Sequence, residues 1–150
     1  MLSTVIAVLG TLLGAVVAGL LQHRAARTAR DDARIDHRRD QELTAVTDFA
    51  SAIASHRRAM TVREELRLTG ADPDRLTEAR AESHNTRSAI EAPKVLVAIL
   101  APSLAPAAQE AAQASYAIRN AADLETLTAL REDAIKAADR FVAAAARRFA

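Results

Sequence analysis

The chain has 150 residues, a formal net charge of +1, no cysteine, and a composition that is 50% hydrophobic but only 3% aromatic. The balanced charge provides no global field to attract nucleic acid or an acidic substrate. The lack of cysteine excludes disulfides, a thiolate nucleophile and cysteine-ligated zinc. A core made mainly of alanine and branched aliphatic side chains favours closely packed helices over a sheet.

The first predicted element is an apolar segment at the amino terminus. Residues 2–21 read LSTVIAVLGTLLGAVVAGLL and contain no charged residue. About 20 apolar residues in a helix span the hydrocarbon core of a bilayer, so residues 1–22 are predicted to form a transmembrane helix. A cleaved signal peptide and a buried helix of a soluble domain are the alternatives. The signal peptide is disfavoured because residues 2–4 carry no positive charge and Gln22-His23-Arg24 is a poor cleavage context.

Small residues recur on one face of this segment. Gly10, Gly14 and Ala18 are spaced four residues apart, and such a row lets two membrane helices approach backbone to backbone. The segment is therefore predicted to self-associate through this face. The alternative is that glycine and alanine are simply common in membrane helices.

The basic residues that follow the segment predict its orientation. Arg24, Arg27 and Arg30 come after the apolar run with no acidic residue among them. Positive flanks stay in the cytoplasm, so we expect a single-pass protein of the cell membrane. Its amino terminus would lie outside and residues 22–150 in the cytoplasm.

Residues 23–42 are predicted to form a charged helical stalk. They are mostly alanine, arginine and aspartate, and Ile35 is their only large apolar residue. A helix that is polar all round is typically solvated. Neither glycine nor proline occurs between Leu20 and Thr69, so the helix is expected to run without interruption from the membrane segment into the following domain.

Residues 43–150 are predicted to form an antiparallel bundle of about four helices. Its first helix ends before Gly70, which suits the left-handed C′ position. Asp72-Pro73 then provides an N-cap and a proline at the first helical position. The expected helices are 43–68, 73–91, 104–119 and 123–148. Their predicted inward-facing residues include Leu43, Val46, Phe49, Ile53, Met60, Leu76, Ser83, Thr86, Ile90, Leu104, Ala108, Ala111, Ala112, Ser115, Ile118, Leu124, Leu127, Leu130, Ala134, Ala138, Phe141 and Val142.

The segment between the second and third bundle helices contains several prolines. Pro93 is predicted to break or kink the second helix at Ala92. The apolar run 94–100 has the β-branched residues of a strand, but no partner strand is predicted elsewhere. A buried helical turn or two is therefore expected there, with Ser103 as a candidate N-cap for the third helix.

Polar residues of the first two bundle helices are predicted to face one another. Antiparallel helices joined at residues 70–72 bring residues 56 and 84 to comparable distances from the turn. A buried structural network is the favoured interpretation of this cluster, and a ligand-binding site is the alternative. The candidate polar network comprises His56, Arg63, Glu82, His84, Asn85 and Arg87.

Other chemistries have weaker support in the sequence. Zinc held by His56, His84 and Glu82 is geometrically conceivable, but no histidine has the Glu-x-x-His spacing of di-metal bundles. No glycine-rich phosphate loop is present, and nothing marks a Ser-His-Asp site. Arginines alternate with acids, which disfavours nucleic acid as a partner. The sequence therefore predicts neither an enzyme nor a bound cofactor or metal.

Three runs carry a family resemblance: IAVLGTLLGAVVAGLLQHRAAR, HRRAM followed by VREELRLTGA, and ARAESHNTRSAIEAP. They are similar to KilB-type proteins of actinobacterial (Streptomyces) plasmids and chromosomes. The resemblance covers most of the chain. It implies a small membrane-associated protein linked to the spread of conjugative plasmids, and it supplies no residue-level site.

These features together predict a membrane-anchored helical protein that works by protein–protein contact. Its partners would be other proteins or further copies of the chain. The alternative is a membrane-tethered module that binds a small ligand, or senses one, through the polar cluster around His56 and His84.

Overall fold

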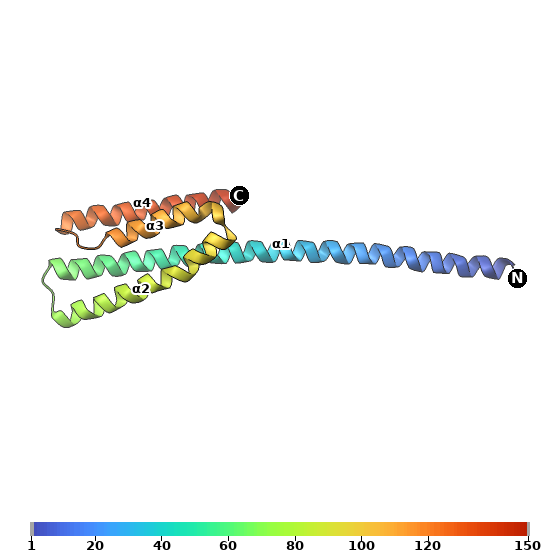
Figure 1. Cartoon of the computed structure of the whole chain (residues 1–150), viewed down its shortest axis with the longest axis horizontal. Coiled ribbons are helices and arrows are strands. Elements are labelled where there is room, and N and C mark those ends of the chain that lie inside the picture. Colours follow the sequence, from blue (N-terminus) through green and yellow to red (C-terminus); the bar gives the residue numbers. More distant parts are fainter. Residues whose placement is uncertain (1, 150) are drawn as a thin grey trace. The chain divides into compact units, whose positions relative to one another are not determined.

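The structure is a computed structural model that describes the backbone of residues 2–149 and the side chains of residues 30 and 33–149. Within this part of the chain the fold is all-α, which confirms the predicted class and the number of main helices. The elements, in order, are α1 (Leu2–Leu68), α2 (Pro73–Leu100), the short 3₁₀ helix η1 (Pro102–Leu104), α3 (Ala105–Ala117) and α4 (Leu124–Phe149) (Figure 1). The chain separates into two units, residues 1–40 and 41–150.

The first unit consists of the amino-terminal part of α1. The helix continues without interruption from Leu2 to Leu68, as the absence of glycine and proline between Leu20 and Thr69 predicted. The predicted transmembrane segment, with Gly10, Gly14 and Ala18, lies outside the residues whose side chains are described, and so do Arg24 and Arg27. No helix formed by the described residues is both long and apolar enough to span a bilayer.

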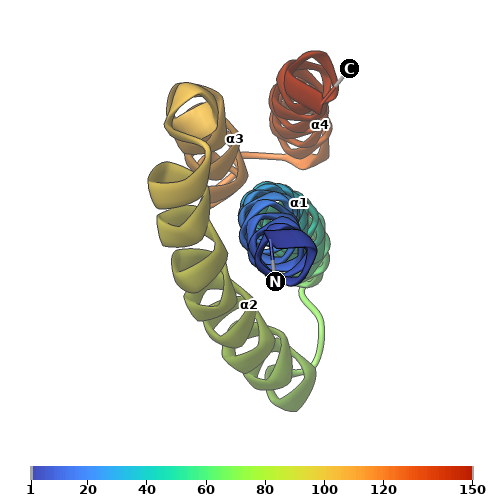
Figure 2. The ribbon, with the colours of Figure 1, turned by 90° about the vertical axis from the view of Figure 1, so that its right-hand side faces the viewer.

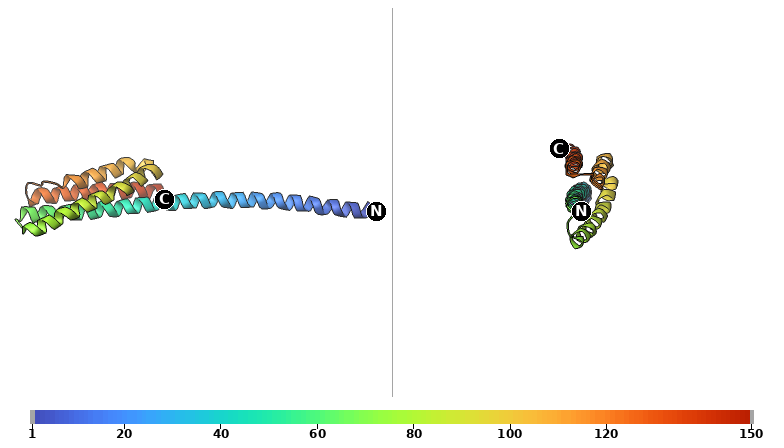
Figure 3. Two further views of the ribbon diagram at one scale, coloured as in Figure 1. Left: turned by 60° about the horizontal axis from the view of Figure 1, so that its bottom comes forward. Right: turned by 90° about the vertical axis from the view of Figure 1, so that its left-hand side faces the viewer.

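The second unit is a bundle in which successive helices alternate in direction. α2 returns antiparallel to the end of α1, α3 reverses again, and α4 runs back beside α3 (Figure 3). Seen end-on, α2, α3 and α4 form an arc around the carboxy-terminal part of α1 (Figure 2). Arg148 near the end of α4 donates to the carboxylate of Glu42 on α1, with Nη2 2.8 Å from Oε2. This ion pair ties the last helix to the start of the bundle.

The predicted helix boundaries are largely confirmed by the turns. Gly70 has φ 67°, in the left-handed region that glycine adopts without strain. The Asp72 carboxylate accepts from the backbone N–H of Asp74 at 2.8 Å, and Pro73 occupies the first helical position. Before α4, the Asp123 carboxylate accepts from the backbone N–H of Thr126 at 2.7 Å. Side-chain caps encoded locally therefore set both helix starts.

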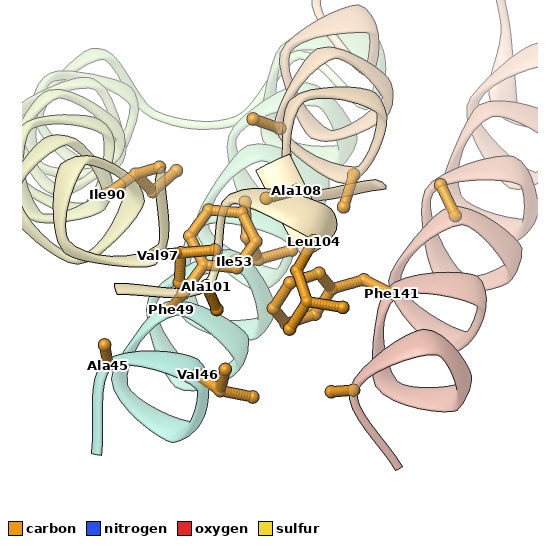
Figure 4. Close-up of a cluster of buried hydrophobic side chains, with 14 residues drawn as sticks. Ala45, Val46, Phe49, Ile53, Ile90, Val97, Ala101, Leu104, Ala108 and Phe141 are labelled. Atoms are coloured by element: carbon orange, nitrogen blue, oxygen red, sulfur yellow. The ribbon is translucent and has the colours of Figure 1, made fainter. Parts of the chain in front are cut away.

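The core consists of two clusters of buried apolar side chains. The larger one joins all four main helices, and at its centre the rings of Phe49 and Phe141 meet edge to face with centroids 4.8 Å apart. Leu104 and Ile53 lie beside these rings (Figure 4). The smaller cluster lies toward the α1–α2 turn and contains Met60, Ile118, Ala121, Leu127 and Ala134. All six predicted inward positions of the third helix, from Leu104 to Ile118, are buried.

The predicted break at Pro93 is wrong, because α2 continues through the proline to Leu100. A proline removes the hydrogen bond to the carbonyl four residues earlier, and here that residue, Ala89, is exposed. Because Ala89 is exposed, water can hydrate its carbonyl in place of the lost hydrogen bond. Ile90 and Val97 are both fully buried, so packing on either side of Pro93 holds the helix together.

Several predicted inward positions are also corrected. The run 94–100 is helical as expected, but only Val97 in it is buried. Leu43, Leu124 and Val142 are about half exposed. Leu124 is the first residue of its helix, and Phe141 takes the inward position beside Val142. Ser103 lies inside η1 and does not cap α3; its hydroxyl accepts from Arg148.

Candidate functional site

The site is centred on His56, which α1 carries into the interface with α2 and α3. Its side chain is 1% exposed, and its Nδ1 lies 3.1 Å from the Thr86 hydroxyl oxygen on α2. The Tyr116 ring of α3 meets the imidazole edge to face, with centroids 5.5 Å apart. Burial, followed by the nearby Arg87 charge, lowers the pKa of His56 from 6.5 to about 4. The imidazole is therefore neutral at physiological pH.

The Thr86 hydroxyl determines which imidazole nitrogen carries the proton. Thr86 Oγ1 lies 2.9 Å from the carbonyl oxygen of Glu82 and donates its proton to it. The hydroxyl oxygen then accepts from His56 Nδ1–H. In the neutral ring this leaves Nε2 as an acceptor, and Nε2 is buried without a hydrogen-bond partner among the described residues.

Tyr116 links the histidine to charges on the outer face of α2. The Arg87 guanidinium carbon lies 4.2 Å from the centre of the Tyr116 ring, which is a cation–π contact. The Tyr116 hydroxyl donates to Glu91 Oε1 at 3.4 Å, and Lys94 pairs with the same carboxylate. Burial and the negative charge of Glu91 raise the pKa of Tyr116, so the phenol stays protonated.

A second polar group lies about two turns further along α1. Arg63 Nη1 donates to the Ser83 hydroxyl at 3.4 Å. The Glu64 side chain is fully buried and accepts from Arg67 Nε at 2.7 Å, and Arg63 Nε lies 3.8 Å from its other oxygen. Arg67 also donates to the carbonyl of Ala121 before α4. One carboxylate thus serves two guanidinium groups.

A cavity of about 80 Å³ opens between these side chains. We call it the arginine cavity. Its lining comprises His56, Met60, Arg63, Ser83, His84, Arg87, Tyr116 and Arg119.

Four of the six residues of the predicted polar network line this cavity: His56, Arg63, His84 and Arg87. His56 is hydrogen-bonded to Thr86 and not to His84, whose side chain is exposed. The exposed Glu82 lines a separate surface depression, and Asn85 is exposed. Of the three arginines predicted to set the topology, only Arg30 has a described side chain, and it is exposed.

The sequence did not identify Tyr116 or Arg119 as site residues, nor Thr86 as the hydrogen-bond partner of His56. Thr86 was predicted only to face inward, because it lies four residues before Ile90 on the same helix face. Tyr116 and Arg119 belong to α3 and the turn after it, and their register against the α1–α2 hairpin has no signal in the sequence. Among the described side chains, no three histidine, aspartate or glutamate residues converge as a metal site would require.

Comparisons with known proteins identify one family. A family model described as KilB plasmid transfer protein matches residues 43–149. A protein named KilB from Streptomyces lividans is 60% identical over 149 residues, which cover 99% of each of the two chains. No solved structure gives a significant match.

Proposed function

Because the chain belongs to the KilB plasmid transfer protein family, we propose that it takes part in conjugative plasmid transfer as a single-pass membrane protein acting through protein contacts. The resemblance expected from the three sequence runs is confirmed by both comparisons. Family membership is the observation that carries the plasmid-related role. The membrane anchor and the contact surface are the parts that the proposal adds.

The anchor is supported by the uncharged run of residues 2–21. Its length suits a bilayer, and the flank of Arg24, Arg27 and Arg30 favours a cytoplasmic bundle. We further propose that the bundle binds partners and does not catalyse a reaction, since the sequence contains no cysteine and only one glycine after residue 19.

The contact surface in this proposal is an exposed apolar stripe on the last part of α2. Ala92, Val95, Leu96 and Ile99 recur at spacings of three and four residues, so they share one helix face. The three larger side chains are between 44% and 65% exposed. Such a stripe is typical of a helix that packs against another helix.

The occupant that we propose for this stripe is the same stripe of a second copy. α2 ends beside the residues at which α1 enters the bundle, since Val97 and Ala101 share a core cluster with Ala45 and Val46. The stripe is thus at the end of the bundle nearest the anchor along the chain. Two copies joined through Gly10, Gly14 and Ala18 would present it to each other at high effective concentration.

Cysteine crosslinking tests the second copy directly, because the natural chain contains no thiol. Ala92→Cys places a single reporter in the exposed stripe, and Ala81→Cys, also exposed on α2, is the matched control. Oxidation of membranes that contain the full chain should give a dimer with Ala92→Cys and little with Ala81→Cys. Adding Leu96→Glu and Ile99→Glu should abolish this dimer.

The same preparations test the anchor. The full chain should remain in the membrane fraction after a high-salt wash, and a chain released by salt would contradict a transmembrane helix. Equal dimer yields from the two cysteine positions would contradict the proposed surface. Replacing Gly10 and Gly14 by isoleucine should lower the dimer yield, and an unchanged yield would show that these residues do not bring the copies together.

A further inference from the structure

The arginine cavity is the right size for a small ion and too small for a typical organic ligand. Its volume is about 80 Å³, which holds a few water molecules. Sites for drug-sized molecules measure roughly 300–1,000 Å³. An occupant is therefore an ion, or one small charged group of a larger molecule whose remainder stays outside.

The charges around the cavity favour an anion. Three arginines line it, Arg63, Arg87 and Arg119, and no aspartate or glutamate is among the lining residues. Two carboxylates bond to lining residues: Glu64 is shared between Arg63 and Arg67, and Glu91 accepts from the Tyr116 hydroxyl and pairs with Lys94. Neither Arg87 nor Arg119 forms an ion pair with any residue whose side chain is described. Guanidinium groups match the geometry of tetrahedral oxyanions particularly well.

His56 provides an independent indication of the ligand. It lines the cavity, is 1% exposed, and its Nε2 is buried without a partner in the part of the chain that the structure describes. A buried polar atom of this kind costs about 1–3 kcal/mol if it stays unpaired. Because Nε2 is an acceptor in the neutral ring, the group that would satisfy it must carry a proton.

We propose that the arginine cavity binds a phosphate group, either as hydrogen phosphate or as the phosphate of a small phosphomonoester. The guanidinium groups of Arg87 and Arg119 hold the anionic oxygens, and the P–OH group of hydrogen phosphate, or of the singly protonated form of a phosphomonoester, donates to His56 Nε2. Sulfate has the same size but carries no proton at neutral pH, so it satisfies the arginines and not the histidine. This site does not depend on the membrane anchor or on the stripe of α2.

Thermal unfolding of the full chain in detergent, followed by circular dichroism, tests the proposal with inorganic phosphate as the probe. Phosphate at ten times its dissociation constant should raise the unfolding midpoint by about 3 °C relative to chloride at equal ionic strength. Sulfate should give a smaller shift. The shift with adenosine monophosphate, compared with the shift with inorganic phosphate, shows which of the two is the better ligand. Adenosine, which lacks the phosphate, is the control.

Variants show whether the effect arises in this cavity. Arg119→Gln replaces an exposed side chain without a described ion pair and should weaken phosphate binding about tenfold. Arg75→Gln, at an exposed arginine outside the cavity lining, is the matched control and should leave binding unchanged. Equal shifts with phosphate, sulfate and chloride, or equal losses in both variants, would overturn the proposal and indicate a non-specific salt effect.

Discussion

The two halves of the bundle, α1 with α2 and α3 with α4, contribute different chemistry to its interior. α3 and α4 supply small apolar side chains, and Ala108, Ala111, Ala112, Ala134 and Ala137 are all at most 1% exposed. α1 and α2 instead bury several polar residues beside their apolar ones, and the most fully buried of these are His56, Glu64 and Ser83.

This difference places most of the buried polar side chains on α1 and α2, although α3 buries Ser115 and, with the turn that follows it, adds Tyr116 and Arg119 to the arginine cavity. Alanine side chains let helices approach closely and contain no polar atom that needs a partner. Two of the three buried side-chain atoms without a hydrogen-bond partner, among the described residues, belong to α1: His56 Nε2 and Glu64 Oε1. Buried polar groups of this kind are costly to stability, so the α1–α2 side is where a function is expected.

The largest effect should come from removing the aromatic side chain that α4 contributes to the core. Phe141→Ala deletes a ring that is 1% exposed and in edge-to-face contact with Phe49. We expect the free energy of unfolding to fall by about 3–5 kcal/mol, because the ring's burial is lost and a cavity remains. Chemical denaturation followed by circular dichroism measures this. A loss below about 1 kcal/mol would contradict the packing of α4 against α1.

The free energy of unfolding should depend on pH, and the pKa of His56 determines whether it rises or falls. Burial and the Arg87 charge lower its pKa from 6.5 to about 4 in the folded chain. Between these pH values the unfolded chain binds a proton that the folded chain does not. Stability is therefore fully present above pH 6.5 and falls as the pH decreases toward 4, by about 3 kcal/mol in total.

The matched variant for this pH effect is His56→Gln, which cannot titrate. The difference in unfolding free energy between the natural chain and the variant should change across pH 4–6.5 and stay constant above pH 7. A difference that does not vary with pH would show that His56 is not held neutral.

The α3–α4 half should not tolerate larger side chains at its buried alanine positions. Ala112→Leu adds three carbon atoms at a fully buried position of α3, and overpacking of this kind costs about 1–3 kcal/mol. Ala117→Leu, at an exposed position of the same helix, should change the free energy of unfolding by less than about 0.5 kcal/mol. Equal effects of the two substitutions would indicate that α3 does not pack closely at Ala112.

Local signals predicted most of the helix boundaries. Gly70 and Asp72-Pro73 act within a few residues of themselves, and the structure confirms both of them. Pro93 is the exception, because its local preference is opposed by burial of Ile90 and Val97 on either side. Packing around a helix can outweigh a single unfavourable backbone position, and nothing near Pro93 in the sequence shows that packing.

The candidate site was predicted in outline only. Equal distance from the α1–α2 turn placed His56 and His84 together, and both line the arginine cavity. The hydrogen-bond partner of His56 is nevertheless Thr86, because rotation about each helix axis decides which side chain faces the interface. Tyr116 entered the site from α3, across a separation of 60 residues from His56.

By itself, the sequence determined the helical class, the uninterrupted first helix, the caps and the family, because composition, breakers and capping residues act locally and the similarity runs along the chain. The tertiary structure decided how α3 lies against the α1–α2 hairpin. That packing alone buries His56, brings Tyr116 and Arg119 to it, and leaves the stripe from Ala92 to Ile99 uncovered. Contacts between distant segments depend on shape complementarity over the whole core, which no short stretch of sequence encodes.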